Sequence, residues 1–192
     1  PMRRATSATF SGVTSSVSFD RSPMRRSTRS ILVIAATKPD SFQVVRRARV
    51  QASPDRVFPF INDFRHWPEW SPWEKLDPGM KKDLGGTDSG VGSSYAWEGN
   101  KKAGQGRMEI TESQPPSRVV IDLDFIKPFK SQNVTEFELA PKDGGTDLTW
   151  TMRGPANFMT KVMMVFMSMD KMVGRDFEEG LANLKRVAEA PR

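Results

Sequence analysis

The stretch SPDRVFPFINDFRHWPEWSPW, residues 53–73, constrains the fold of this chain most strongly. Ser53 is a favourable N-cap, and Pro54 suits the first position of a helix, where a missing N–H costs nothing. Apolar residues then recur at helical spacing until Pro68 interrupts the pattern, and the stretch ends with three tryptophans. We therefore predict a helix from Pro54 and a second, short helical segment over residues 66–73.

Alternation of apolar and polar residues predicts strands on both sides of these helices. The pattern is clearest over residues 118–126, where Val119, Ile121 and Leu123 alternate with mostly polar neighbours. The expected strands cover residues 42–52, part of 75–90, 92–99, 104–112, 118–126, 132–140 and 146–153. Short turns such as Pro115-Pro116-Ser117 and Asp143-Gly144-Gly145 join them, which favours an antiparallel sheet with one buried face.

A long helix is predicted at the end of the chain, over residues 158–190, with Asn157 as its N-cap. Its apolar stripe consists of Met159, Met163, Phe166, Val173, Phe177, Leu181, Leu184 and Ala188. At 1.5 Å per residue such a helix is roughly 50 Å long, enough to cross a small domain. Because glycine weakens helices, we expect a bend near Gly174.

Four segments in this order resemble the SRPBCC, or START-like (Bet v 1-like), superfamily of polyketide cyclase/dehydrase and lipid-transport type. They are residues 53–73, YAWEGNKKAGQGRMEI (95–110), PPSRVVIDLDFIKPF (115–129) and DFEEGLANLK (176–185). The resemblance covers about residues 42–190. It implies an α+β helix-grip fold, in which a curved antiparallel sheet wraps around a long C-terminal helix, with two short helices after the first strand. It also implies a cavity between the sheet and that helix.

The charge distribution separates a basic tail from a nearly neutral domain. Residues 1–40 carry seven basic and two acidic residues, a net +5, whereas the other 22 basic and 21 acidic residues leave +1. A nucleic-acid-binding protein concentrates positive charge on a folded face, so we expect no nucleic-acid partner. We divide the chain into a mobile Ser/Thr/Arg-rich tail, residues 1–40, and a START-like domain, residues 41–190.

The first interpretation of the tail is a disordered segment, because residues 1–30 are rich in Ser, Thr and Arg and show no sustained periodicity. The second is a targeting peptide, because transit peptides share its scarcity of acidic residues. The apolar run ILVIAA, residues 31–36, is too short to span a bilayer and would be the end of a truncated anchor in a third interpretation. We expect a cytoplasmic protein, with a membrane-anchored form as the alternative. The oligomeric state stays open.

Composition restricts the chemistry available. The chain has no cysteine and one histidine, His66, so we expect no metal site, no disulfide and no thiolate nucleophile. His66 is more typical of a surface or capping residue than of a catalyst. Phosphate-binding and dinucleotide-binding glycine motifs are absent from the sequence, and we expect no cofactor.

The candidate ligand-binding residues are apolar side chains expected to face the cavity. They are Trp67, Trp70, Trp73, Trp97, Met108, Ile110, Ile121, Leu123, Phe125, Phe137, Trp150, Met152, Met163, Phe166 and Met167. Some of them must belong to the core, and the tryptophans fit either a pocket mouth or the core. The run VMMVFMSM, residues 162–169, is apolar nearly all round, which fits a buried helix, a ligand tunnel, or a membrane or dimer contact.

Glu98 is a weak candidate for a catalytic acid or base, because it lies among mostly apolar strand residues. Strand alternation argues against it: if Trp97 points inward, Glu98 points outward unless a bulge near Gly99 intervenes. The function we predict is binding of a hydrophobic small molecule or lipid. The alternatives are a polyketide cyclase/dehydrase-like enzyme and a module that uses the Met-rich helix face on a protein or membrane. The sequence identifies neither the ligand nor a reaction.

Overall fold

The computed structural model describes residues 33–191 and has an α+β architecture. Its elements are β1 (Ser41–Val50), α2 (Pro54–Asn62), the 3-10 helices η1 (Phe64–Glu69) and η2 (Pro72–Lys75), β2 (Lys81–Gly85), β3 (Ser94–Glu98), β4 (Gln105–Gln114), β5 (Arg118–Lys127), β6 (Ser131–Lys142), β7 (Gly145–Pro155), α3 (Phe158–Phe166) and α4 (Met169–Glu189). The strands form one antiparallel sheet in the order β1-β7-β6-β5-β4-β3-β2. This arrangement is the helix-grip fold that the sequence predicts.

The sheet is a meander closed by its first strand, which pairs with the last. Short turns connect β3 to β7 in sequence, and β1 adds to the free edge of β7 along its whole length. The β6–β7 turn shows why the sequence has glycine there: Asp143 and Gly144 both adopt positive φ, at 41° and 72°. A two-residue turn with that geometry matches the twist of the flanking strands.

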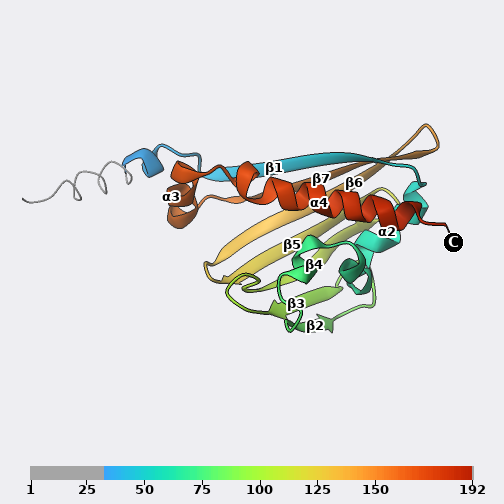
Figure 1. The fold of residues 1–192 in the computed structure, drawn as a ribbon, viewed down its shortest axis with the longest axis horizontal. Helices are drawn as coiled ribbons and strands as arrows, with labels where there is room; N and C mark the ends of the chain where they lie inside the picture. The colour runs from blue at the N-terminus through green and yellow to red at the C-terminus, as the bar shows by residue number, and fades with distance from the viewer. Residues whose placement is uncertain (1–32, 192) are drawn as a thin grey trace, which may run out of the picture.

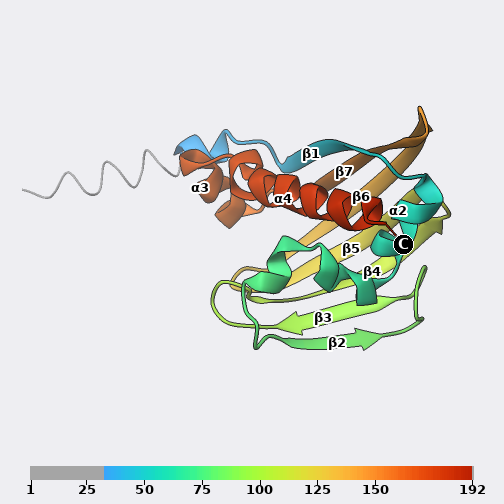
Figure 2. The ribbon, with the colours of Figure 1, turned by 45° about the vertical axis from the view of Figure 1, so that its right-hand side comes forward.

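The helices cover one face of the sheet, which we call the inner face. In Figures 1 and 2, α4 runs along β1 and β7. The helices that follow β1 in sequence, which are α2, η1 and η2, lie over the rest of the same face. Alternate strand residues therefore point toward the helices, and α4 buries Phe177, Leu181, Leu184 and Ala188 against them. The helix stripe predicted over this half is confirmed.

Aromatic rings fill the centre of the space between α4 and the sheet. Trp150 stacks on Phe137 with ring centroids 4.8 Å apart, and on Phe177 with centroids 4.0 Å apart. Trp70 meets both Trp150 and Phe137 edge to face. These rings bury large apolar areas in the favoured geometries, so this part of the molecule is packed core.

The C-terminal helix is not continuous, and this corrects the sequence prediction. It breaks at Met167 and Ser168 into α3 and α4, while Gly174 lies inside α4. A side chain at position 174 would collide with the Arg46 guanidinium, so the glycine allows a close approach rather than a bend. Phe166, expected on the buried stripe, is exposed at the break.

The expectations for the tail fall mainly on residues 1–32, which lie outside the described residues. Residues 33–36, the end of the apolar run ILVIAA, form one helical turn before β1. Within residues 33–191, no helix combines the length and apolar character that crossing a bilayer requires.

Candidate functional site

The structure divides the predicted ligand-binding residues into three groups. The first group is core. Its members are almost fully buried and pack against one another: Trp67, Trp70, Met108, Ile110, Ile121, Phe137, Trp150 and Met152. The indole N–H groups of Trp67 and Trp70 donate to the carbonyls of Ile61 and Phe60, at 3.1 and 2.9 Å. The hydrogen bonds of these two tryptophans thus connect η1 and the residue after it to the end of α2.

The second group is half-buried on or against the inner face and consists of Trp73, Trp97, Leu123 and Phe125. Trp97 and Phe125 meet edge to face with centroids 5.8 Å apart, on β3 and β5. Gly106 on the strand between them makes this possible, because a side chain there would occupy the space of the Trp97 ring. Trp73 of η2 touches Trp150 and Phe177 edge to face and leaves part of its surface uncovered.

The third group belongs to α3 and its end. Met163 is half-buried, whereas Phe166 and Met167 are exposed. These residues do not lie among the aromatic core, because the helix breaks before α4 begins its course along β1.

A polar cluster that sequence analysis missed lies next to the second group. The hydroxyl of Tyr95 on β3 donates to Glu74 of η2 at 2.7 Å, and Lys82 of β2 pairs with the other oxygen of that carboxylate. Burial, together with the hydrogen bond to Glu74, raises the pKa of Tyr95 well above its usual range. The available signal was the inward phase that Tyr95 shares with Trp97.

A second polar group, Asp176 of α4, faces η2. Burial raises the pKa of the Asp176 carboxyl, and the neighbouring Trp73 side chain opposes part of that increase. Asp176 is thus a carboxyl that the fold moves toward the neutral form. No sequence pattern indicates this shift, because Asp176 lies beside the apolar stripe of the helix rather than on it.

Glu98 lies on the opposite side of the sheet from the inner face. β3 is regular up to Glu98, its side chain is 56% exposed, and its nearest cation is Lys127 at 3.9 Å. The alternation argument therefore holds, and no bulge turns this carboxylate inward. His66 is a surface residue whose Nδ1 lies 2.7 Å from Glu69. Arg107 and Glu109 form the surface pair that their shared strand phase indicates.

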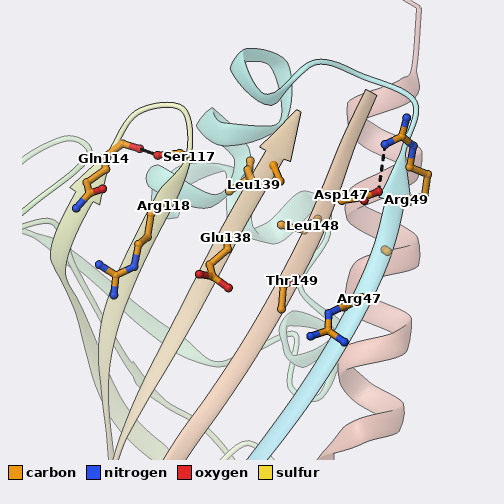
Figure 3. Close-up of a pocket in the computed structure, with 12 residues that line it drawn as sticks. Arg47, Arg49, Gln114, Ser117, Arg118, Glu138, Leu139, Asp147, Leu148 and Thr149 are labelled. Atoms are coloured by element: carbon orange, nitrogen blue, oxygen red, sulfur yellow. Dashed lines mark hydrogen bonds and ion pairs between the residues drawn. The ribbon is translucent and has the colours of Figure 1, made fainter. Parts of the chain in front are cut away.

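A hollow of about 690 Å³ opens on the outer face of the sheet, over β1, β7, β6 and β5 (Figure 3). Figure 3 shows Arg47, Arg118 and Glu138 around it. Arg49 at its margin is paired with Asp147 at 3.1 Å, and Arg118 is paired with Glu112 and Glu136. Most of the residues that line the hollow are charged or polar, and it lies on the outer face, so it is not the cavity between sheet and helix that the family resemblance implies.

Acidic side chains and the single histidine do not cluster in the described part of the chain. Within residues 33–191, no three side chains among histidine, aspartate and glutamate come close enough together to hold an ion. Several acidic side chains there instead form ion pairs or hydrogen bonds with neighbouring basic or polar groups. Glu136, for example, lies between Arg118 and Arg153.

The fold and the half-buried aromatic face define a helix-grip protein, and a comparison with family models agrees. The model described as polyketide cyclase/dehydrase and lipid transport matches residues 41–189. The chain therefore belongs to this family of the SRPBCC superfamily. The comparison with curated proteins found no match.

Several solved structures share the fold at low sequence identity. A protein from Rhizobium leguminosarum is 15% identical, with a TM-score of 0.57 over 78% of this chain and 95% of its own. A protein from Chromobacterium violaceum is 18% identical, with a TM-score of 0.55 over 80% of this chain and 100% of its own. Ara h 8.0201 is 10% identical, with a TM-score of 0.53 over 77% and 97%. These similarities establish the fold.

Proposed function

We propose that the chain binds a hydrophobic small molecule or lipid on the inner face, between β3–β5 and α4. The observation that carries the proposal is the incomplete burial of Trp97, Phe125 and Trp73 beside a core whose other aromatic rings are covered. Large apolar rings left partly exposed on a concave, helix-covered face are the usual lining of a small-molecule site. Membership of a family described as cyclases, dehydrases and lipid transporters supports the same class of ligand.

The polar groups around this face suggest that the ligand is amphipathic. Covering apolar surface gains about 25 cal/mol per Å², which the ordering of the ligand partly offsets. Tyr95, Glu74 and Lys82 lie at one edge of the aromatic residues, and Asp176 lies beside Trp73. A ligand with an apolar body and a hydroxyl or carbonyl group would satisfy both kinds of neighbour.

The first test is native mass spectrometry of the purified protein, followed by solvent extraction of any bound molecule. Affinity for the extracted molecule, or for a fluorescent fatty-acid probe, is then measured for Trp97→Ala and Phe125→Ala. Each variant is expected to bind about tenfold more weakly, because each removes a large apolar contact. Glu138→Ala, on the outer face, is the matched control and should bind like the wild type. Unchanged affinity in the folded Trp97 and Phe125 variants would reject this site.

A catalytic role is the second candidate, and one observation favours it. Asp176 combines partial burial with a raised pKa beside the aromatic face, which is the environment of a general acid. If the chain is a cyclase/dehydrase-like enzyme, Asp176→Asn should abolish turnover of an aromatic polyketide substrate and leave its affinity nearly unchanged. A carrier would show no turnover in either form. Equal turnover in the variant and the wild type would exclude Asp176 from the reaction.

A further inference from the structure

Exposed apolar side chains gather at one end of the molecule. Three segments form this end, which we call the lysine-rich end: the β3–β4 loop (99–104), the last residue of β5 with the β5–β6 turn (127–130), and α3 with the helix break (158–168). Figure 1 shows α3 and the β5–β6 turn at the same end of the ribbon, the end where the chain approaches β1.

Contacts hold the three segments together. The side-chain amide of Asn157, the N-cap of α3, donates to the carbonyl of Lys130 at 3.1 Å. The β3–β4 loop lies against the β5–β6 turn, because a side chain at Gly104 would meet the carbonyl of Lys127. Lys161 of α3 pairs with Asp40 just before β1. The end is therefore one continuous surface built from segments far apart in the sequence.

Four large apolar side chains project from this surface. Phe129 is 48% exposed, Phe158 57%, Phe166 71% and Met167 48%. Single exposed apolar residues are common on proteins, but a group of three phenylalanines and a methionine at one end is unusual for a free surface. Phe129 also follows Phe125 on the same strand and turn, so the group adjoins the inner face.

Lysines lie on the same segments as these apolar residues or directly after them, and several have no ion pair. Within residues 33–191, no ion pair involves Lys101, Lys102 or Lys130 of this end, or Lys171 in the first turn of α4. Nearby acids are engaged in ion pairs or hydrogen bonds: Asp40 pairs with Lys161, Glu98 with Lys127 and Asp170 with Arg46. The Asp77 carboxylate, beside the β3–β4 loop, accepts backbone hydrogen bonds from Gly79 and Asn100. The four lysines exceed this one carboxylate that has no ion pair, so the lysine-rich end carries net positive charge beside its exposed apolar side chains.

We propose that the lysine-rich end docks on the surface of a lipid bilayer that contains anionic lipids. Phenylalanine and methionine side chains would enter the boundary between headgroups and acyl chains, while the lysines contact the anionic headgroups. Long lysine side chains suit this role, because their stems follow apolar surface and their ammonium groups reach the headgroups. A second copy of the chain fits less well, because it would bring two lysine-rich surfaces together.

This docking does not depend on which molecule the inner face binds, but it gives that face a direct route to lipid. Phe125 on β5 lies four residues before Phe129, so a docked protein would hold the edge of the aromatic face at the membrane surface. A hydrophobic ligand could then pass between bilayer and protein without crossing much water.

The test is co-sedimentation of the full chain with phosphatidylcholine vesicles, with and without phosphatidylserine. The wild type is expected to bind the phosphatidylserine vesicles, and added salt should weaken binding because the attraction is partly electrostatic. Two variants should each reduce the bound fraction about tenfold. One is Phe129→Ser with Phe158→Ser, and the other is Lys101→Glu, Lys102→Glu and Lys130→Glu combined. All five side chains are exposed, so circular dichroism should show an intact fold.

Two control variants test whether the effect is local. Val91→Ser removes an exposed apolar side chain from the β2–β3 connection, and Arg186→Glu reverses an exposed charge in the last turn of α4. Both should bind vesicles like the wild type. The proposal would be overturned if the wild type did not bind vesicles, or if sedimentation velocity showed a dimer that the Phe129/Phe158 variant abolishes. It would also be overturned if both variants of the lysine-rich end bound vesicles like the wild type. That last result would assign the attraction to the basic segment 1–32 instead.

Discussion

The indole of Trp150 on β7 lies flat on the ring of Phe177 on α4, with centroids 4.0 Å apart and planes inclined by only 12°. Gly180 lies one turn further along α4, and a Cβ there would come within 2.9 Å of the Trp150 ring. The helix can approach the sheet this closely only because position 180 has no side chain. The stack therefore sets the distance between α4 and β7.

The first prediction concerns this glycine. In an exposed helix position, glycine to alanine stabilises by about 1 kcal/mol. Gly180→Ala is instead expected to destabilise the protein by about 1–2 kcal/mol, because the methyl group overpacks the Trp150 ring. Urea denaturation measures the change. Ala182→Gly, at an exposed site two residues away, reports the helix propensity alone and should cost about 1 kcal/mol. A stabilised Gly180→Ala variant would contradict the packing argument.

The second prediction concerns the ionisation of Tyr95, the only tyrosine in the chain. Burial and the Glu74 carboxylate raise its pKa in the folded state. Folding therefore favours the protonated phenol. The resulting stabilisation is complete below about pH 10, the pKa of an unfolded tyrosine, and is lost as the pH rises above it. In an absorbance titration at tyrosinate wavelengths, we expect ionisation only together with alkaline unfolding.

Glu74→Gln separates the two causes of this shift. The variant removes the negative charge but keeps the residue buried, so Tyr95 should ionise at a lower pH than in the wild type, yet still above its ordinary value. Ionisation of wild-type Tyr95 near pH 10 in a protein that circular dichroism shows to be folded would disprove the buried hydrogen bond.

A third prediction concerns acid stability. Burial raises the pKa of Glu136, but hydrogen bonds from Arg118 and Arg153 outweigh it, and the net pKa is lowered. The carboxylate therefore stabilises the fold above about pH 4.3, the unfolded value, and this contribution disappears as the pH falls through the folded pKa. Between neutral and acidic pH, the free energy of unfolding should fall more in the wild type than in Glu136→Gln.

Glu138→Gln is the matched control for that comparison. Glu138 lies two residues along the same strand, is exposed, and has no ion pair within residues 33–191. Its variant should lose stability toward acid pH as the wild type does. If Glu136→Gln is as sensitive to acid as the wild type, the two arginine contacts do not contribute to folding.

Most strands and the first helix could be predicted from the sequence because their signals are local. The alternation from Val119 to Phe125 describes a sheet with one covered face, and β5, Arg118–Lys127, nearly coincides with the predicted strand 118–126. The family resemblance predicted how these elements pack together, with the sheet curved around the C-terminal helix. The break at Met167 was missed because the Met-rich run is apolar on every side and contains neither glycine nor proline. Ser168 followed by Asp170 is an N-cap signal that could have revealed it.

The candidate site was harder to predict, because its parts come from distant segments. Strand phase indicates that Trp97 and Trp150 both face inward, but it cannot show that Trp150 is covered by Phe177 while Trp97 stays half exposed. Burial of that kind depends on where α4 crosses the sheet. The contact of Glu74 with Tyr95 likewise joins η2 to β3 across 21 residues of chain, and no spacing pattern in the sequence predicts it.

The last prediction compares two serines that stand at the N-cap positions of helices in the structure. Ser53 precedes α2, but its side chain makes no capping hydrogen bond. Ser168 precedes α4, and its hydroxyl accepts from the backbone N–H of Lys171 at 3.3 Å. Loss of a capping hydrogen bond typically costs about 1 kcal/mol. Ser168→Ala should therefore lower the free energy of unfolding by about that amount, and Ser53→Ala by only a few tenths.

Urea denaturation of both variants measures the difference, and Ser168→Asp provides a rescue, because aspartate keeps an acceptor and suits the positive end of the helix dipole. The comparison also tests the helix break itself. If residues 158–189 formed one continuous helix in solution, Ser168 would lie in its interior, where alanine is the better residue. Ser168→Ala would then stabilise the protein, so the sign of this one substitution decides between a broken and a continuous C-terminal helix.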